Sequence, residues 1–406
     1  MIFDVLVEFV ASYSLRLQLL LAYCIFISLY LRYVAQHTSP GGITRAALSA
    51  PIVLANLAAP ALFSRNTEIC TVLSICFIIS WLANFKVIGL CIGRGSLTHK
   101  LDYVQFAAVL CMPITPQQIT ENPLAAAVGA AKAGFKPVPR VGSNARLGED
   151  GGSGAQLILG FAIKVALLGA VVFALVNYDL PVHVRNFVYV TGMYAFLSML
   201  MDGPASLATS FIGLKIAPHF DKPYLTCSLT DFWSRRWNLT AGNTLRFLIY
   251  DPIMEQRLVK DRDAFVHRTR FGRQIGIAAS FVVSGIVHEL IFRHAVGGAD
   301  LCSLGWRWFV FFSLQGPLLA LENEIKKWAK PRSIEVPKPV AILFTCSMLM
   351  WLGDSLFFYP AVESGLAERI VSSLSETYGG LYERLAPSLE NAYKGVYNGI
   401  AARSEL

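Results

Sequence analysis

Charged residues are scarce in this sequence. Asp, Glu, Lys and Arg make up only 15% of its 406 residues, whereas hydrophobic residues make up 54%. Soluble domains carry about 25% charged residues, so this composition argues against an ordinary soluble protein and indicates a polytopic membrane protein. The length-per-domain estimate for soluble chains does not apply here. We expect one integral membrane domain and no large soluble module.

Motifs that mark several other kinds of site are missing. The eight cysteines form no CxxC pair and no Cys/His cluster, which argues against disulfides and zinc. His288, Glu289 and His294 do not make HExxH, because that motif needs two histidines four residues apart on one helix face. A GxSxG nucleophile elbow, a Walker A loop and a complete GxGxxG are also lacking. We therefore predict no metal site and no serine-hydrolase site of the soluble type.

Long apolar runs are what the sequence has instead. A helix that crosses a bilayer needs about 20 mostly apolar residues, and eight stretches meet that requirement. The sequence thus predicts an all-α fold with about eight transmembrane helices. We also consider an extension of the fifth span past Pro204 to Ile216, as a re-entrant or interfacial piece. The predicted spans are residues 10–31, 46–64, 69–92, 156–178, 184–203, 274–292, 304–321 and 339–360.

Basic residues gather in three connections, residues 93–155, 217–273 and 322–338, and the net charge is +8. Cytoplasmic loops of membrane proteins carry an excess of Lys and Arg, so we attribute this charge to topology and expect no nucleic-acid partner. Placing all three loops in the cytosol is self-consistent. The fourth and fifth spans then form one hairpin, the sixth and seventh another, and both termini face the lumen.

His288 is an ionisable residue inside the sixth apolar run. Such a group is costly in a membrane and by default marks a functional site. Ser284 lies one helical turn earlier on the same face and can orient the ring, and Glu289 is a second costly group at similar depth. A neutral imidazole in a water-poor interior can act as a general base toward a hydroxyl. The alternative is a structural histidine bonded to a neighbouring helix.

The stretch SLTDFWSRRWN (Ser228 to Asn238) is polar and rich in tryptophan. Trp233 and Trp237 are four residues apart and are expected to share a helix face, and tryptophans beside charges also commonly mark a membrane interface. Arg235 and Arg236 would then lie on other faces, available to phosphate or to Asp231.

Asn238 ends that stretch. Its side-chain amide can donate to a carbonyl oxygen on which negative charge develops. Two alternatives stay open. Asn238 can cap a helix, and Asn238-Leu-Thr240 is also a glycosylation sequon, which would require a lumenal loop.

These motifs together resemble those of the membrane-bound O-acyltransferase superfamily, and within it the wax synthase branch of plants and algae. The resemblance rests on SLTDFWSRRWN, on LRFLIYDP (Leu245 to Pro252) and on SGIVHE (Ser284 to Glu289). SWLANFK (Ser80 to Lys86) in the third span and LFFYP (Leu356 to Pro360) also resemble that branch. The likeness covers about residues 15–362, whereas residues 115–155 and the tail match less well.

The resemblance implies a helical fold that encloses a tunnel, with acyl-CoA entering from the cytosol and a lipophilic alcohol from the bilayer. The family's histidine falls on His288 and its asparagine on Asn238. We expect an acyl-CoA-dependent O-acyltransferase that makes a wax ester by direct transfer, with His288 as general base. Arg235, Arg236 and Arg246 are candidates to contact the phosphates of CoA, which serves as a co-substrate and not as a resident cofactor.

Other acceptors remain open: a sterol, a diacylglycerol or a terpenoid alcohol. A lipid or ion transporter is the alternative from a different class, but it would distribute charged residues over several spans. We expect an acyltransferase domain over residues 1–362 with its motif region at 217–292, and a C-terminal tail over 363–406. The expected location is the endoplasmic reticulum membrane.

Overall fold

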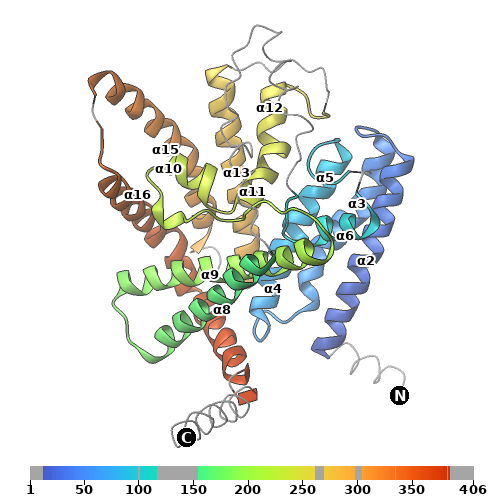
Figure 1. Cartoon of the computed structure of the whole chain (residues 1–406), viewed down its shortest axis with the longest axis horizontal. Coiled ribbons are helices and arrows are strands. Elements are labelled where there is room, and N and C mark those ends of the chain that lie inside the picture. The colour runs from blue at the N-terminus through green and yellow to red at the C-terminus, as the bar shows by residue number, and fades with distance from the viewer. Residues whose placement is uncertain are drawn as a thin grey trace, which may run out of the picture.

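The computed structural model describes residues 12–98, 101–116, 154–260, 269–297, 304–333, 335–381 and 383–384. Within these ranges the regular secondary structure is helical, apart from one isolated antiparallel β-bridge between Pro116 and Ile216. Figure 1 shows the long helices gathered into one bundle. The predicted all-α fold is confirmed. Most of the connection 115–155 and the end of the tail lie outside the described residues.

All eight predicted apolar runs form helices. These are α2 (Tyr13–His37), α3 with η1 (Ile43–Ala58, Ala59–Leu62), α4 with η2 and α5 (Ile69–Ile75, Cys76–Ala83, Asn84–Cys91), α8 (Gly154–Asn177), α9 (Val182–Phe211), α13 (Arg270–Val296), α15 (Arg307–Ala329), and α16 with η7 and α17 (Lys338–Gly353, Asp354–Phe358, Tyr359–Glu363).

Six of these eight, within the described ranges, are long and apolar enough to cross a membrane. The other two are α9 and α15. Asp202 lies within α9, where it pairs with Lys164 of α8, and the last turns of α15 carry four charged residues. A count of eight spans therefore stays a prediction. The fifth span does extend past Pro204, because α9 continues through it to Phe211, and a re-entrant or interfacial position of that extension stays a prediction.

Small residues bring α13 and α15 close together. A Cβ atom at Gly285 would lie 2.8 Å from the carbonyl oxygen of Phe309, and one at Gly316 would lie 3.0 Å from the Cα of Ala278. Small side chains at such positions allow close backbone approach, which replaces the hydrophobic driving force that helices lack in lipid. This hairpin carries His288 on α13.

Polar side chains of SWLANFK are satisfied inside the bundle. Ser80 donates to the carbonyl oxygen of Asn56 (2.7 Å), and Asn56 donates through Nδ2 to Oδ1 of Asn84 (2.8 Å). Lys86 is 2% exposed and donates to three backbone carbonyl oxygens near the end of α6 (Tyr103–Cys111). Water is absent from hydrocarbon, so such groups need partners within the protein. The motif therefore ties α3, the third span and α6 together.

The segment YVQFAAVLCMPI (Tyr103 to Ile114), which is too short to span, forms α6 and packs into a core cluster with α2 and α5. Beyond residue 362, residues 366–381 form a further helix. Leu366 and Leu374 of this helix are buried, and the hydroxyl of Tyr378 donates to the carbonyl oxygen of Val165 at 2.7 Å. The packing of the bundle thus continues past residue 362, the predicted end of the acyltransferase domain. A functional division at that residue stays a prediction.

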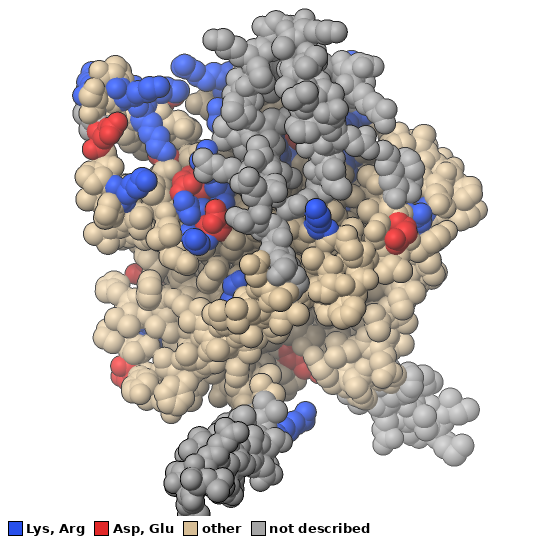
Figure 2. Space-filling view, in the orientation of Figure 1, with Lys and Arg blue, Asp and Glu red and all other residues tan. Residues whose placement is uncertain are grey.

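Described residues of the three basic connections meet at one end of the bundle. Arg94, after α5, donates to the carbonyl oxygens of Arg257 and Leu258, so the first connection contacts the second. Arg270, at the start of α13, lines one cavity together with Lys327 of α15. Figure 2 shows Lys and Arg gathered mainly in the upper part of that face, above a largely apolar belt. One end of the bundle is therefore basic, as the positive-inside rule requires of a cytosolic side.

We predict that this basic end faces the cytosol. Arg257 is exposed, so an Arg257→Cys variant in sealed microsomes should react with an impermeant maleimide added from the cytosolic side. The unsubstituted protein reports the background from Cys227, which is only partly exposed. Labelling from the lumenal side alone, or a glycan on Asn238, would contradict the topology.

Candidate active site

His288, on α13, lies between two aromatic rings that come from other helices. Its imidazole stacks on Phe312 of α15, with ring centroids 3.8 Å apart and an interplanar angle of 24°. The indole of Trp81 meets it edge-on, at 5.3 Å and 70°. Nδ1 lies 2.7 Å from the carbonyl oxygen of Ser284 and 3.4 Å from its hydroxyl. Ser284 orients the ring as predicted, but mainly through its backbone.

The contact with Ser284 decides where the proton of a neutral His288 ring resides. A carbonyl oxygen can only accept a hydrogen bond, so Nδ1 must carry the hydrogen, and Nε2 then has the free lone pair. No described residue donates to Nε2. The ring is only partly buried by its protein neighbours. Nε2 of His288 is therefore the ring nitrogen left without a partner in the described part of the chain.

The tryptophan-rich stretch folds into two short consecutive helices, α10 (Leu229–Asp231) and the π-helix η4 (Phe232–Arg236). Ser228 begins them, because its hydroxyl oxygen accepts the backbone N–H of Asp231 at 3.1 Å. A serine at this position satisfies one of the N–H groups that a helix leaves unpaired at its start.

Glu322 of α15 supplies the other acceptors at that helix start. Its carboxylate accepts the backbone N–H of Leu229 at 2.6 Å and that of Thr230 at 3.4 Å. A negative charge is favoured at a helix N-terminus. The stretch is thus fastened to the helix that also stacks Phe312 on His288.

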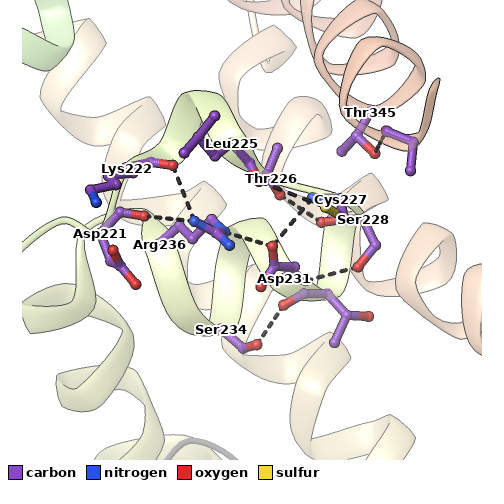
Figure 3. Close-up of polar contacts among 12 residues, drawn as sticks. Asp221, Lys222, Leu225, Thr226, Cys227, Ser228, Asp231, Ser234, Arg236 and Thr345 are labelled. Carbon is purple, nitrogen blue, oxygen red and sulfur yellow. Dashed lines mark hydrogen bonds and ion pairs between the residues drawn. The ribbon is translucent and has the colours of Figure 1, made fainter. Parts of the chain in front are cut away.

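Asp231 and Arg236 form an ion pair within the stretch, at 2.6 Å (Figure 3). Asp231 also accepts the backbone N–H of Cys227, and Arg236 donates to the carbonyl oxygens of Asp221 and Lys222. Arg236 therefore holds two segments of the connection together. Of the two partners that we considered for it, phosphate and Asp231, the structure shows Asp231.

Trp233 and Trp237 do not share a helix face, and that expectation is wrong. The helix ends at Arg236 because Trp237 has an extended backbone, with φ −104° and ψ 123°. Trp233 donates from Nε1 to Oε1 of the fully buried Gln315 at 3.0 Å, and its ring lies against Phe312. Trp237 packs against Phe220 instead. Of these two tryptophans, only Trp233 contacts Phe312, the ring that stacks on His288.

Asn238 adopts a left-handed conformation with φ 41° and caps α11 (Leu239–Leu245). Its Oδ1 accepts the backbone N–H of Ala241 at 3.2 Å, which leaves Nδ2 as the group able to donate. Ala241 packs in one cluster with Trp81 and Val287, the residue before His288. The start of α11 is thus near the histidine. The capping alternative holds for Oδ1, and the role of Nδ2 toward substrate stays a prediction.

His219 is a buried histidine. It could not be singled out from the sequence, because it lies outside the apolar runs. Its Nδ1 is 2.9 Å from the hydroxyl of Thr240, and its carbonyl oxygen accepts the backbone N–H of Leu239. Burial lowers the pKa of His219 to about 4, so the ring is neutral at physiological pH. It fixes the start of α11 beside Asn238.

Glu289 is bonded to backbone N–H groups and to a cation, and its supporting role in the reaction stays a prediction. Its carboxylate, 1% exposed, accepts the backbone N–H groups of Trp306 (3.0 Å) and Phe309 (3.4 Å) at the start of α15. Arg293 pairs with it at 2.8 Å. The buried charge is therefore stabilised by a helix N-terminus and a cation.

The three candidate CoA-binding arginines differ in their surroundings. Arg236 is engaged with Asp231, and Arg246 lies 3.4 Å from Asp251. Arg235 is exposed, and no hydrogen bond or ion pair joins its guanidinium to the described part of the chain. Arg235 is thus the most available of the three to a phosphate.

Four further residues that build the site went unrecognised in the sequence: Phe312 and Trp81, which contact His288, and Gln315 and Glu322, which hold the tryptophan-rich stretch. Phe312, Gln315 and Glu322 sit on α15 at positions 312, 315 and 322, and a helical spacing of three and seven places them on one face. That periodicity was the available signal, because a glutamine and a glutamate interrupt this apolar face. Trp81 gave no signal except its place in SWLANFK.

Comparison with known proteins gives consistent results. Residues 216–313 match the membrane bound O-acyl transferase family. Acyl-CoA–sterol O-acyltransferase 1 of Arabidopsis thaliana is 30% identical over 338 residues, which cover 81% of this chain and 86% of that protein. The long-chain-alcohol O-fatty-acyltransferase of Simmondsia chinensis is 27% identical over 339 residues, 83% of this chain and 87% of that protein.

We predict that Glu322→Ala destabilises the protein by about 1–3 kcal/mol, because it leaves two backbone N–H groups unpaired in partly buried surroundings. Glu324→Ala is the matched control on the same helix. Its side chain is 53% exposed and pairs only with Lys327, so its loss should leave the melting temperature unchanged. Thermal unfolding of both variants in detergent measures the difference. Equal melting temperatures would show that Glu322 does not fasten α10.

Proposed function

The chain belongs to the membrane-bound O-acyltransferase family, in its wax synthase branch, and on this premise we propose that it esterifies a long-chain fatty alcohol with the acyl group of acyl-CoA. It is an integral membrane acyltransferase whose acceptor is a lipophilic alcohol. Family membership favours this chemistry over the transporter considered from the sequence. We further propose the endoplasmic reticulum as its membrane.

His288 is the general base in this proposal. The alcohol hydroxyl donates to Nε2, and its oxygen attacks the thioester carbonyl carbon as the proton moves to the ring. The tetrahedral intermediate then collapses, the C–S bond breaks, and His288 returns the proton to the departing CoA thiolate. The products are an ester and free CoA, and no acyl-enzyme forms. Holding both substrates together replaces a bimolecular encounter, which lowers the entropic part of the barrier.

The observation that carries this proposal is the hydrogen bond from Nδ1 of His288 to the carbonyl oxygen of Ser284. It fixes the tautomer that leaves Nε2 basic. Glu289 does not compete for the role, since its carboxylate is held by Arg293 and the start of α15. Asn238 can donate through Nδ2 to a substrate carbonyl or orient the histidine. Arg235 is the residue that we assign to a CoA phosphate, because its guanidinium is exposed.

A sterol is the second candidate acceptor. It is supported by the likeness to an Arabidopsis protein named as an acyl-CoA–sterol O-acyltransferase, whereas other relatives are named for long-chain alcohols. Diacylglycerol and terpenoid alcohols are the remaining acceptors. Expression in a host that lacks neutral-lipid synthesis, fed with fatty alcohols and sterols, would separate them. Wax esters are the expected product, and sterol esters alone would overturn the choice of acceptor.

We predict that His288→Gln reduces turnover about 10²- to 10⁴-fold, the usual contribution of a general base. Glutamine keeps polarity and hydrogen bonding but cannot take a proton. His294→Gln is the matched control, since His294 lies six residues further along α13 beside Arg65 and should retain most activity. The measurement is ester synthesis by the purified proteins at equal concentration. If His288→Gln keeps a third or more of wild-type turnover, roughly a threefold effect, His288 is a structural residue.

A further inference from the structure

Trp81 carries a buried hydrogen-bond donor with no partner in the described part of the chain. The residue is 4% exposed, and its Nε1 is buried without an acceptor. An unpaired buried N–H costs about 1–3 kcal/mol, and native structures leave few such groups. The ring that bears this donor is the one that meets His288 edge-on at 5.3 Å.

Residues before and after Trp81 in the sequence anchor its helix to α3. It lies in the π-helix η2, and such bulges occur frequently at functional sites. Ser80, just before it, donates to Asn56, and Asn84, three residues later, is paired with the side chain of Asn56. The polar side chains of SWLANFK are thus bonded to α3 or to residues near the end of α6, while the indole N–H among them has no acceptor in the described part of the chain.

We propose that the indole N–H of Trp81 donates a hydrogen bond to the thioester carbonyl oxygen of the acyl donor, making Trp81 a catalytic residue. This inference rests on the proposed acyl transfer from acyl-CoA to an alcohol. As the alcohol oxygen bonds to the carbonyl carbon, the π electron pair moves to the carbonyl oxygen and the proton passes to Nε2 of His288. Trp81 stabilises that oxygen until the C–S bond breaks and the proton reaches the sulfur.

The chemistry of the two neighbouring groups favours this assignment. An indole N–H can only donate, so it cannot take the proton of the alcohol, which Nε2 of His288 accepts. Its natural partner is an oxygen that only accepts, and the carbonyl oxygen of the thioester is one. A donor fixed before the reaction in water-poor surroundings stabilises developing negative charge without reorganisation. Asn238 caps α11 through Oδ1, so its Nδ2 is able to act as a second donor beside Trp81.

A structural use of the same N–H is the competing explanation. Phe77 and Phe85 both lie edge-on to Trp81, with centroids 5.5 and 6.1 Å away, and an N–H can point at a ring face as a weak hydrogen bond. In that case its removal would lower stability. If the donor serves substrate only, its removal should leave the resting protein as stable as before, because it breaks no bond within the chain.

The test replaces Trp81 by 3-benzothienylalanine, which keeps the shape of the indole but has sulfur in place of N–H. Trp81→Phe is the encoded second variant, and the same replacement at Trp351, which is 74% exposed on α16, is the matched control. We expect kcat to fall about 10²- to 10³-fold, as for loss of one oxyanion donor. The KM for acyl-CoA and the melting temperature should change little, and the Trp351 replacement should have no effect.

The outcomes are separable. A kcat within about threefold of wild type in the benzothienyl variant overturns the role of Trp81, as does a loss of activity seen only in Trp81→Phe or only together with a lower melting temperature. If wild-type protein makes no ester from acyl-CoA with any alcohol in the same assay, the proposed function fails and this inference fails with it. An active wild type with an unaffected benzothienyl variant refutes Trp81 alone.

Discussion

The contact between α13 and α15 determines the surroundings of His288. Gly285 and Gly316 allow the two backbones to approach closely, and the carboxylate of Glu289 on α13 accepts N–H groups at the start of α15. The two glycines thereby set the distance of α15 from α13, and Glu289 sets its position along the helix axis. That position brings Phe312 onto the imidazole ring. A shift of α15 by one turn, about 5.4 Å, would separate the two rings.

The same helix then fixes the tryptophan-rich stretch. Gln315 accepts from Trp233, and Glu322 accepts from the start of α10. The buried carboxylate of Glu289 and the partly buried one of Glu322 thus both accept from helix N-termini, where the backbone leaves unpaired donors. In a bilayer such donors cannot turn to water. His288 differs from both carboxylates, because only one of its two nitrogens is bonded to the chain.

Hydropathy alone sufficed to predict the long helical runs, since each of the eight apolar runs is helical, but not α10, α11 or the helix at 366–381. The cost of an ionisable group in lipid pointed to His288, and a spacing of four residues pointed to Ser284. Local pattern could not show that Trp237 leaves the helix and packs against Phe220, which lies 17 residues earlier in the chain. Nor could it show Trp81 beside His288, because 207 residues separate them and only the packing of the third span against α13 joins them. The sequence could not show what balances the charge of Glu289, because the N–H groups that donate to its carboxylate lie on the next helix.

The central claim is that Nδ1 of His288 holds the proton and Nε2 is the base. Nitrogen-15 NMR of the imidazole-labelled protein tests it most directly, with His288→Gln used to identify the His288 signals. We expect the Nδ1 signal of His288 to have the chemical shift of a protonated nitrogen. The Nε2 signal should have the chemical shift of an unprotonated nitrogen. A signal showing the proton on Nε2 would contradict it, because that tautomer cannot accept a proton from the alcohol at the nitrogen left free by Ser284.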